Sequence, residues 1–175
     1  MRITVSGPPG SGTTSLAKHL SEKYSFELIS AGEVFRSLAS EKDMNLIDFG
    51  KLCEEDPAVD SLIDKRQKEI GEQKDNIIIE GRLAGHMIRN ADLKIWVLAS
   101  PECRAERIAE RENVIFESAK NETVLREASE AARYKKYYDI DIYNLSIYDL
   151  VISSEKWNKE GLASVVDIAV ENINQ

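Results

Sequence analysis

The stretch GPPGSGTTSLAKHL, from Gly7 to Leu20, constrains the fold of this chain more than any other segment. It fits the phosphate-binding pattern G-x-x-x-x-G-K-[ST] at its first residue, at Gly12 and at Thr14, but Thr13 occupies the lysine position. A short apolar run, Arg2 to Ser6, precedes the loop, and apolar residues at helical spacing follow it. Because the pattern requires a strand before the loop and a helix after it, the sequence predicts a strand–loop–helix unit that can hold phosphate.

The glycines of this loop allow backbone conformations that residues with side chains avoid, so successive N–H groups can point at phosphate oxygens. The N-terminus of the following helix adds roughly 0.3–1 kcal/mol per favourable charge. Thr13 has neither the charge nor the reach of lysine, and losing one preorganised donor costs about 3–4 kcal/mol in a transition state. We therefore expect phosphate binding to tolerate this threonine better than catalysis does. The alternative is a glycine turn that only joins strand to helix.

Short apolar runs alternate with helical patterns along the rest of the chain. This alternation is typical of an α/β fold with a parallel sheet covered on both faces, and 175 residues suit one domain. Ala31 to about Gln73 is a predicted helical insertion, and NVIFESAKN, residues 113–121, is expected to connect two later helices. The predicted strands are residues 2–6, 26–29, 77–79, 94–98 and 150–152, and the predicted helices are residues 12–24, 101–112, 121–138 and one from about residue 159.

The charge and cysteine content of the chain exclude several classes of function. A net charge of −8, from 31 acidic and 23 basic residues, disfavours binding to nucleic acid or to an anionic membrane. The apolar stretch after Arg2 is too short for a signal peptide or a membrane span. Cys53 and Cys103 have neither zinc-ligand nor disulfide-framework spacing. We expect a cytoplasmic protein, and a monomer is the working expectation.

Polar residues follow three of the predicted strands. The glycine loop follows the first, SAGEVFR with Arg36 the second, and Glu80 and Arg82 of EGRLAG follow the third. Because ligands of parallel α/β sheets collect at the carboxyl ends of the strands, these loops should meet at one edge. Glu80, which ends an apolar strand, and the hydroxyl of Thr14 are candidate Mg²⁺ contacts. Glu80 taken alone is equally compatible with a solvated strand end.

Arginines form stripes on two of the predicted helices. Arg104, Arg107 and Arg111 lie three and four residues apart, and Arg126 and Arg133 lie seven apart on the next helix. One interpretation is an ordinary solvated face with ion pairs, and Arg104 fits it. The other is a set of planar, permanently charged groups that bind transferring phosphates bidentately.

Together these segments resemble the nucleoside monophosphate kinases, and most closely the cytidylate kinases of archaeal type. The resemblance covers nearly the whole chain, through ITVSGPPGSGTTSLAKHL, LISAGEVFR, EGRLAGHMIRNADLKIWV and YYDIDIYNLSIYDLVISSEKW. It implies a P-loop kinase fold, a central parallel five-stranded sheet flanked by helices. The implied core is residues 1–30, 75–111 and 139–175, with a monophosphate-binding insertion at about 31–74 and a lid at about 112–125.

The resemblance further implies transfer of the γ-phosphoryl group of ATP to CMP, and to dCMP, with Mg²⁺ as cofactor. Arg36 and Arg82 would bind the phosphate of the acceptor. The arginines that would close over the transferring group are Arg107, Arg111, Arg126 and Arg133. The residues that would surround the ATP phosphates are Gly7, Pro8, Pro9, Gly10, Ser11, Gly12, Thr13, Thr14 and Ser15.

Thr13 departs from the usual pattern of the family and leaves the catalytic cation to be supplied from elsewhere. Lys18 lies five residues further along the helix, so its side chain points in a different direction from that of Thr13 and is a poor substitute for the lysine. We therefore expect a lid arginine, Arg133 or Arg126, to replace the lysine.

Two other functions are compatible with the same residues. A nucleotide-binding regulatory module without phosphotransfer would account for the missing lysine, although the guanine-reading N-K-x-D pattern is absent and the arginine stripes would lack a purpose. A P-loop kinase for AMP or another small acceptor would use the same loops. Leu83 and Ala84 stand where a polar contact to the base would be expected, so the residues that read cytosine are not assigned.

Overall fold

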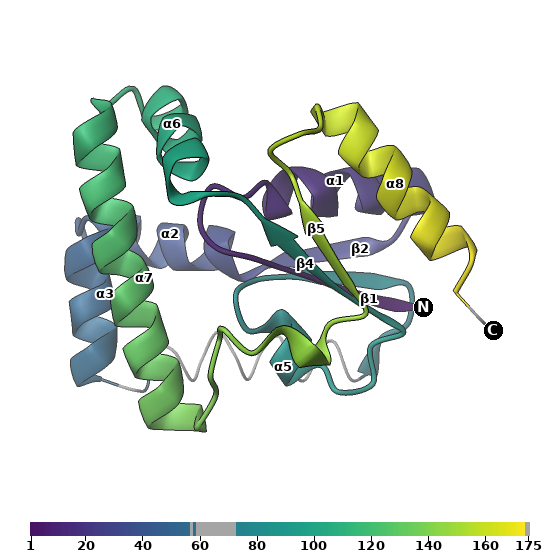
Figure 1. Ribbon diagram of the computed structural model, residues 1–175. Helices are drawn as coiled ribbons and strands as arrows, with labels where there is room; N and C mark the ends of the chain where they lie inside the picture. Colours follow the sequence, from purple (N-terminus) through teal and green to yellow (C-terminus); the bar gives the residue numbers. More distant parts are fainter. Residues whose placement is uncertain (57, 59–72, 174–175) are drawn as a thin grey trace.

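A five-stranded parallel sheet forms the centre of the protein (Figure 1). The computed structural model describes residues 1–56, 58 and 73–173. β1 lies in the middle of the sheet, where Val5 stands opposite Glu80 of β3 and Ile95 of β4. Because all pairings are parallel, the carboxyl ends of the strands share one edge. In spatial order the strands are β2 (Glu27–Ser30), β3 (Ile77–Glu80), β1 (Arg2–Ser6), β4 (Leu93–Leu98) and β5 (Leu150–Ser153).

The helices follow the strands along the chain, and several begin at residues whose side chains cap them. The side chains of Ser30, Asn45, Ser100 and Asn158 each accept a hydrogen bond from a backbone N–H in the first turn that follows. Within the described residues, no helix combines the length and apolar character needed to cross a bilayer. The helices are α1 (Thr13–Tyr24), α2 (Ala31–Glu41), α3 (Leu46–Glu55), α5 (Ala84–Met87), α6 (Pro101–Glu112), α7 (Phe116–Tyr138) and α8 (Lys159–Glu171), with a 3₁₀ turn at Leu145–Ile147.

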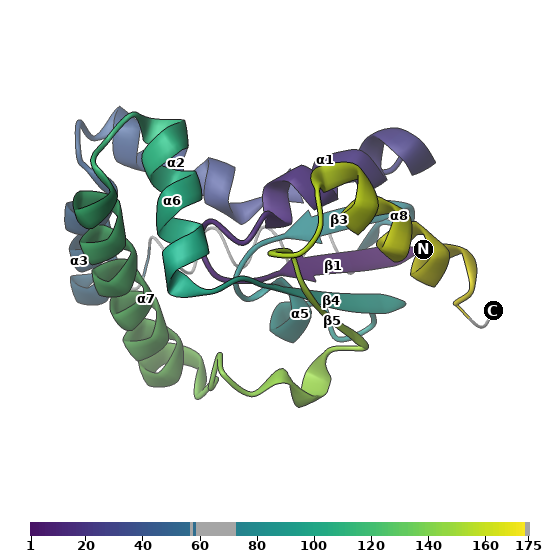
Figure 2. The ribbon, with the colours of Figure 1, turned by 45° about the horizontal axis from the view of Figure 1, so that its top comes forward.

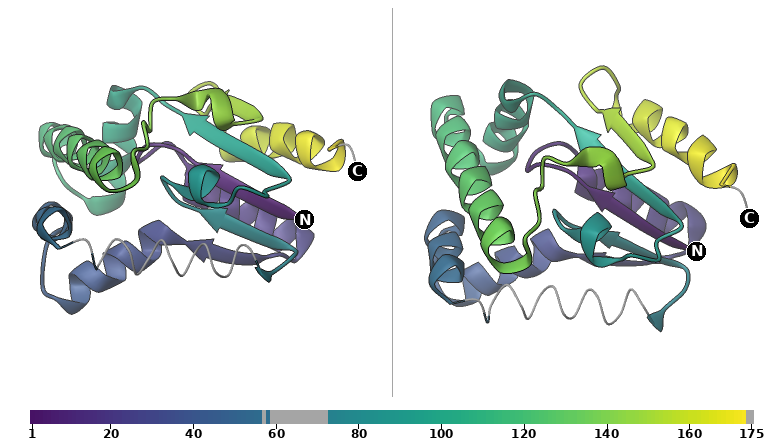
Figure 3. Two further views of the ribbon diagram at one scale, coloured as in Figure 1. Left: turned by 90° about the horizontal axis from the view of Figure 1, so that it is seen from below. Right: turned by 60° about the horizontal axis from the view of Figure 1, so that its bottom comes forward.

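Different elements cover the two faces of the sheet. α1 and α8 lie together on one face, and α5 and the chain leading into β5 lie on the other (Figures 1 and 3). Each fully buried Leu, Ile or Val contributes roughly 1.5–3 kcal/mol to stability. The first face is sealed by Ile3, Val5, Leu16, Leu20, Ile95 and Val166, and the second by Ile77, Ile79, Ala84 and Ile88.

A separate group of helices stands beyond the carboxyl edge of the sheet. α6 and α7 form an antiparallel pair there, α3 packs against α7, and α2 contacts α3 (Figure 2). Phe35 of α2 and Phe49 of α3 form their own small core, with ring centroids 4.8 Å apart. The hydroxyl of Tyr137 in α7 donates to the carbonyl of Cys53 in α3 over 3.4 Å. The helices that carry the predicted arginines therefore face the ends of the strands.

The predicted α/β architecture is confirmed, with differences at a few boundaries. α7 begins at Phe116, five residues before its predicted start, because the segment after Asn113 contains neither glycine nor proline. Asn113 ends α6 in the left-handed conformation, so a short connection suffices. The four-residue helix α5 was not predicted. In the predicted insertion, α2 and α3 are helical as expected, whereas residues 57 and 59–72 lie outside the described residues.

Candidate active site

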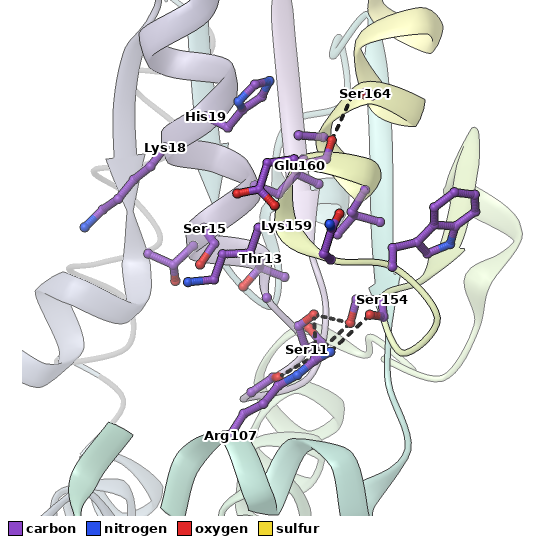
Figure 4. A pocket seen from close by; sticks show the side chains of 18 of the residues that line it. Ser11, Thr13, Ser15, Lys18, His19, Arg107, Ser154, Lys159, Glu160 and Ser164 are labelled. Carbon is purple, nitrogen blue, oxygen red and sulfur yellow. Dashed lines mark hydrogen bonds between the residues drawn. The ribbon is translucent and has the colours of Figure 1, made fainter. Parts of the chain in front are cut away.

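A cavity of about 1050 Å³ opens beside the glycine loop, between α1 and α8 (Figure 4). This volume reaches the upper end of the range for small-molecule sites and can hold a nucleotide. α6 and the connection between β5 and α8 complete its walls. The residues around it include Gly10 to Leu16, Lys18, Arg107, Arg111, Ser154 and Trp157.

Close packing and backbone conformation explain the glycines of the loop. Gly10 and Gly12 have φ angles of +81° and +100°, in the left-handed region that side chains disfavour. At Gly7, a Cβ atom would lie 2.4 Å from the carbonyl oxygen of Val97 in β4. Gly12 is also the N-cap of α1 and supplies no side-chain cap. The first N–H groups of α1 therefore stay available to an anion in the cavity.

Arg107 braces the glycine loop from α6. Its Nη1 donates to the hydroxyl of Ser154 over 2.8 Å and to the carbonyls of Gly10 and Ser11 over 3.3 and 3.4 Å. Its Nη2 donates to the carbonyl of Ser154 over 3.0 Å, and the Ser154 hydroxyl donates to the carbonyl of Ser11 over 2.7 Å. Figure 4 shows these bonds between Ser11, Arg107 and Ser154, which all line the cavity. They tie the loop after β1 to the end of β5.

A buried carboxylate holds the side chain at the lysine position. The hydroxyl of Thr13 donates to Oε1 of Glu80 over 2.7 Å, and the hydroxyl of Ser30 donates to Oε2. Glu80 ends β3 and is only 5% exposed. The carboxylate thus joins the first residue of α1 to the last residue of β2.

Arg36 lies partly buried among other cations at the carboxyl edge. Burial, followed by the positive charges of Arg111 and Arg126, lowers the pKa of its guanidinium, while Glu80 acts in the opposite sense. Arg111 also lines the cavity, and its side chain is 53% exposed beside its ion-pair partner Glu112. Positive charge therefore gathers between the cavity and α2.

Glu130, buried in α7, holds arginines from two parts of the chain. Nε and Nη2 of Arg82 donate to its Oε2 over 2.8 and 2.7 Å, and Nε of Arg126 donates to its Oε1 over 2.8 Å. Burial alone would raise the pKa of Glu130, but the charges of Arg82 and Arg126 outweigh it and lower that pKa to about 2. Glu130 is therefore ionised at neutral pH and fixes the direction of both guanidinium groups.

Arg104 and Arg133, like Arg126, are not among the residues that line the cavity. Arg133 is 3% exposed and donates to the hydroxyl of Ser129 over 2.7 Å and to the carbonyl of Gly50 in α3 over 3.4 Å. It connects α7 to the insertion. Arg104 is 4% exposed and donates to the carbonyl of Pro9 over 3.2 Å, beneath the glycine loop. Arg104 forms an ion pair with Glu127, as the first interpretation expected, but the expected solvated face is wrong because the residue is buried.

The structure brings the loops after β1, β2 and β3 to one edge, as predicted, and adds residues that the sequence did not indicate. Glu130 lies four residues after Arg126, the spacing of an ion pair on one helix face, so a signal was present. Ser30 accepts from the N–H of Glu33 over 3.3 Å and so caps α2, and a serine three residues before a glutamate is a local signal for such a cap. Its bond to Glu80 depends on strand order, and no local pattern reveals it. No pattern in the sequence indicated the role of Ser154.

Comparison with known proteins agrees with this geometry. Residues 2–156 match the model of the cytidylate kinase-like family. A cytidylate kinase of Methanocorpusculum labreanum is 57% identical over 173 residues, covering 99% of this chain and 98% of the relative. A cytidylate kinase of Methanoculleus marisnigri is 59% identical over 170 residues, covering 97% of this chain and 94% of the relative.

Solved structures with little sequence identity show the same fold. An uncharacterized protein from Eubacterium ventriosum superposes with a TM-score of 0.72 at 18% identity, covering 98% of this chain and 99% of the other. Shikimate kinase from Bacteroides thetaiotaomicron superposes with a TM-score of 0.63 at 14% identity, covering 98% of both chains. The predicted P-loop kinase fold is confirmed. With the match of residues 2–156 and these near full-length relatives, the chain belongs to the cytidylate kinase-like family.

Proposed function

We propose that this protein is a cytidylate kinase, which transfers the γ-phosphoryl group of ATP to CMP and forms ADP and CDP. The observation that carries the proposal is full-length identity of 57% and 59% to proteins named cytidylate kinase. The site supports it, because a nucleotide-sized cavity lies beside the glycine loop and arginines gather at the neighbouring edge. dCMP is a second acceptor in this proposal, as the family resemblance implies. The cytoplasm, which supplies both nucleotides, is the proposed location.

The donor phosphates would lie on the glycine loop, from Gly7 to Ser15. Backbone N–H groups and the start of α1 bind them there without a lysine. Arg107 braces the loop through the carbonyls of Gly10 and Ser11, so it would hold the loop in its binding shape. It also lines the cavity and can face the nucleotide.

The residues near the loop fit a hydrated Mg²⁺ ion. Among the described residues no cluster of three or more His, Cys, Asp and Glu side chains could hold a metal on its own. Mg²⁺ in kinases is instead bound by substrate phosphates, waters and one or two protein groups. Thr14 supplies a hydroxyl beside the loop, and the Glu80 carboxylate can accept hydrogen bonds from waters of the ion. When bound, the ion neutralises charge on the transferring phosphoryl group.

The acceptor phosphate would lie at Arg36 and Arg82. In the transfer, an oxygen of the CMP phosphate forms a bond to the γ-phosphorus while the bond from that phosphorus to the β,γ-bridging oxygen breaks. The protein contributes position and positive charge rather than covalent chemistry. Glu130 holds Arg82 and Arg126 in fixed directions, so these groups need little rearrangement during the reaction.

Arg111 is our candidate for the charge that a P-loop lysine would supply. It lines the donor cavity and lies close enough to Arg36 to lower the pKa of that acceptor-side group. The sequence favoured Arg133 or Arg126 for this role. Arg133 contacts α3 and Arg126 contacts Glu130, so both would serve the acceptor side and the lid.

Closure of the insertion and the lid would exclude water during transfer. An open site would allow water to accept the γ-phosphoryl group, so exclusion of water protects ATP from hydrolysis. In this proposal α2 and α3, within residues 31–74, move toward the donor cavity. The short connection between α6 and α7, within residues 112–125, moves with them.

Purified protein with ATP and Mg²⁺, supplied in turn with CMP, dCMP, UMP, AMP and GMP, tests the proposal by release of ADP. CMP should give the highest kcat/KM. ADP release no faster with CMP than without an acceptor would exclude the kinase function and favour a regulatory nucleotide-binding module. A preference for AMP would indicate a kinase for another acceptor.

A further inference from the structure

The side chain at the lysine position of the glycine loop reaches the acceptor side through three consecutive contacts. Thr13 donates to Oε1 of Glu80 over 2.7 Å, and Ser30 donates to Oε2 of the same carboxylate. Ser30 also accepts from the N–H of Glu33 and so caps α2, the helix that carries Arg36. We call Thr13, Glu80 and Ser30 the hydroxyl–carboxylate link.

The strand order explains why this link joins two sites. β3 lies between β1 and β2, so a side chain at its carboxyl end stands between the two loops that follow its neighbours. Glu80 is that side chain, and it is 5% exposed. A buried carboxylate needs hydrogen-bond donors, and a hydroxyl on each side supplies them. Movement of α1 relative to α2 would therefore disturb bonds that are costly to lose.

A lysine at position 13 would disturb the link electrostatically. Its ammonium group would pair with Glu80 and compete with the hydroxyl of Ser30. It would also add a cation near Arg36, whose pKa is already lowered by burial and by the charges of Arg111 and Arg126. A threonine hydroxyl donates one hydrogen bond without adding charge. The residue type at position 13 therefore suits a connection more than a phosphate contact.

We propose that Thr13 is a positioning residue that couples the donor site to the acceptor site through Glu80 and Ser30. Occupation of the glycine loop by ATP phosphates then orients α2 and Arg36, and the affinity for CMP rises. This inference rests on the proposed donor and acceptor roles of the two sites. By thermodynamic linkage, CMP must raise the affinity for ATP by the same factor, and couplings of this kind are typically about 5–150-fold.

Matched substitutions at position 13 separate the hydroxyl from the shape of the side chain. Thr13→Val keeps the branched shape and removes the donor, whereas Thr13→Ser keeps the donor. Calorimetry measures the Kd of CMP with and without a non-hydrolysable ATP analogue and Mg²⁺, and the ratio of the two Kd values is the coupling. We expect Thr13→Val to reduce the ratio by about fivefold or more and Thr13→Ser to restore it.

Two further variants test whether the coupling passes through Ser30. Ser30→Ala removes the contact to Glu80 and also the cap of α2. Asn45→Ala removes the cap of the neighbouring helix α3, where Asn45 accepts from the N–H of Asp48 over 2.8 Å, and leaves Glu80 untouched. Ser30→Ala should lower the coupling ratio and Asn45→Ala should not. In the double variant with Thr13→Val, Ser30→Ala should lower the ratio no further, because both changes break one link.

The outcomes separate this inference from the proposed function. An active parent enzyme whose Thr13→Val variant keeps the full ratio, or a parent with a ratio of one, would overturn the link and leave the kinase function intact. A parent that binds ATP but neither binds nor phosphorylates CMP would overturn the proposed function and the link together. Equal loss of coupling in Thr13→Val and Thr13→Ser would also contradict a role for the hydroxyl.

Discussion

The donor and acceptor sides of the site hold their shapes by different means. The glycine loop of the donor side depends on backbone conformation and on hydrogen bonds to its carbonyls. On the acceptor side, ion pairs between charged side chains set the positions of the arginines. Gly10 and Gly12 adopt positive φ angles. Arg107 donates to the hydroxyl of Ser154, which in turn donates to a carbonyl of the loop. Across the edge, the carboxylate of Glu130 orients both Arg82 and Arg126. The shape of the donor side therefore depends on many weak interactions, and the shape of the acceptor side depends on a few strong ion pairs.

This difference explains how the protein can tolerate threonine in place of the usual lysine. Backbone N–H groups and the start of α1 do not depend on the side chain at position 13. Removal of a single buried charge on the acceptor side leaves its partners unpaired in a region of low dielectric constant. Mutations should thus have larger single effects among the ion pairs of α7 than in the side chains of the glycine loop.

The largest effect is expected from Glu130→Ala. It leaves the buried Arg82 without its carboxylate, and breaking a buried pair in this way costs about 3–5 kcal/mol of unfolding free energy. Urea unfolding measures the change. Glu122→Ala, on an exposed position of the same helix, is the control and should stay within about 0.5 kcal/mol of the parent. A loss below about 1 kcal/mol in Glu130→Ala would show that the acceptor side does not depend on this charge.

Arg36→Ala tests the acceptor side through activity. Loss of a preorganised cation at the acceptor phosphate should lower kcat/KM for CMP by about 10²–10³-fold. The KM for ATP should change far less, because Arg36 is not among the residues that line the donor cavity. Steady-state kinetics with each substrate varied in turn gives both values, with the exposed Arg89→Ala as control. Equal losses of kcat/KM for CMP and for ATP would contradict the assignment of Arg36 to the acceptor side alone.

The pH dependence of stability should also reveal the charge of Glu130. Its pKa in the folded protein, about 2, lies below the ordinary value of 4.5, so ionised Glu130 stabilises the fold above about pH 4.5. That stabilisation is lost as the pH falls from 4.5 toward 2. In Glu130→Gln this part of the loss should be absent, so the difference in unfolding free energy between parent and variant should shrink on acidification. A difference that is constant with pH would contradict the assignment.

The sequence predicted the donor side better than the acceptor side for a physical reason. A glycine loop between a strand and a helix is local, so its pattern is visible in consecutive residues such as Gly7, Gly12 and Thr14. The contact of Glu80 with Ser30 and that of Arg82 with Glu130 join residues about 50 positions apart in the chain, as their separations of 50 and 48 show. Those contacts follow from strand order and helix packing, which single-sequence patterns do not encode.

The smallest expected effect comes from Thr13→Lys, which restores the usual phosphate-binding loop. If lysine were simply missing, its return would raise kcat by roughly 10²–10³-fold, the value of one preorganised donor. We expect no such gain, and a kcat equal to or below that of the parent, because Glu80 would bind the new ammonium group and Ser30 would lose its partner. Thr13→Arg provides a second cation of different shape. A large rise in kcat with either residue would mean that the donor side lacks a charge that Arg111 does not supply.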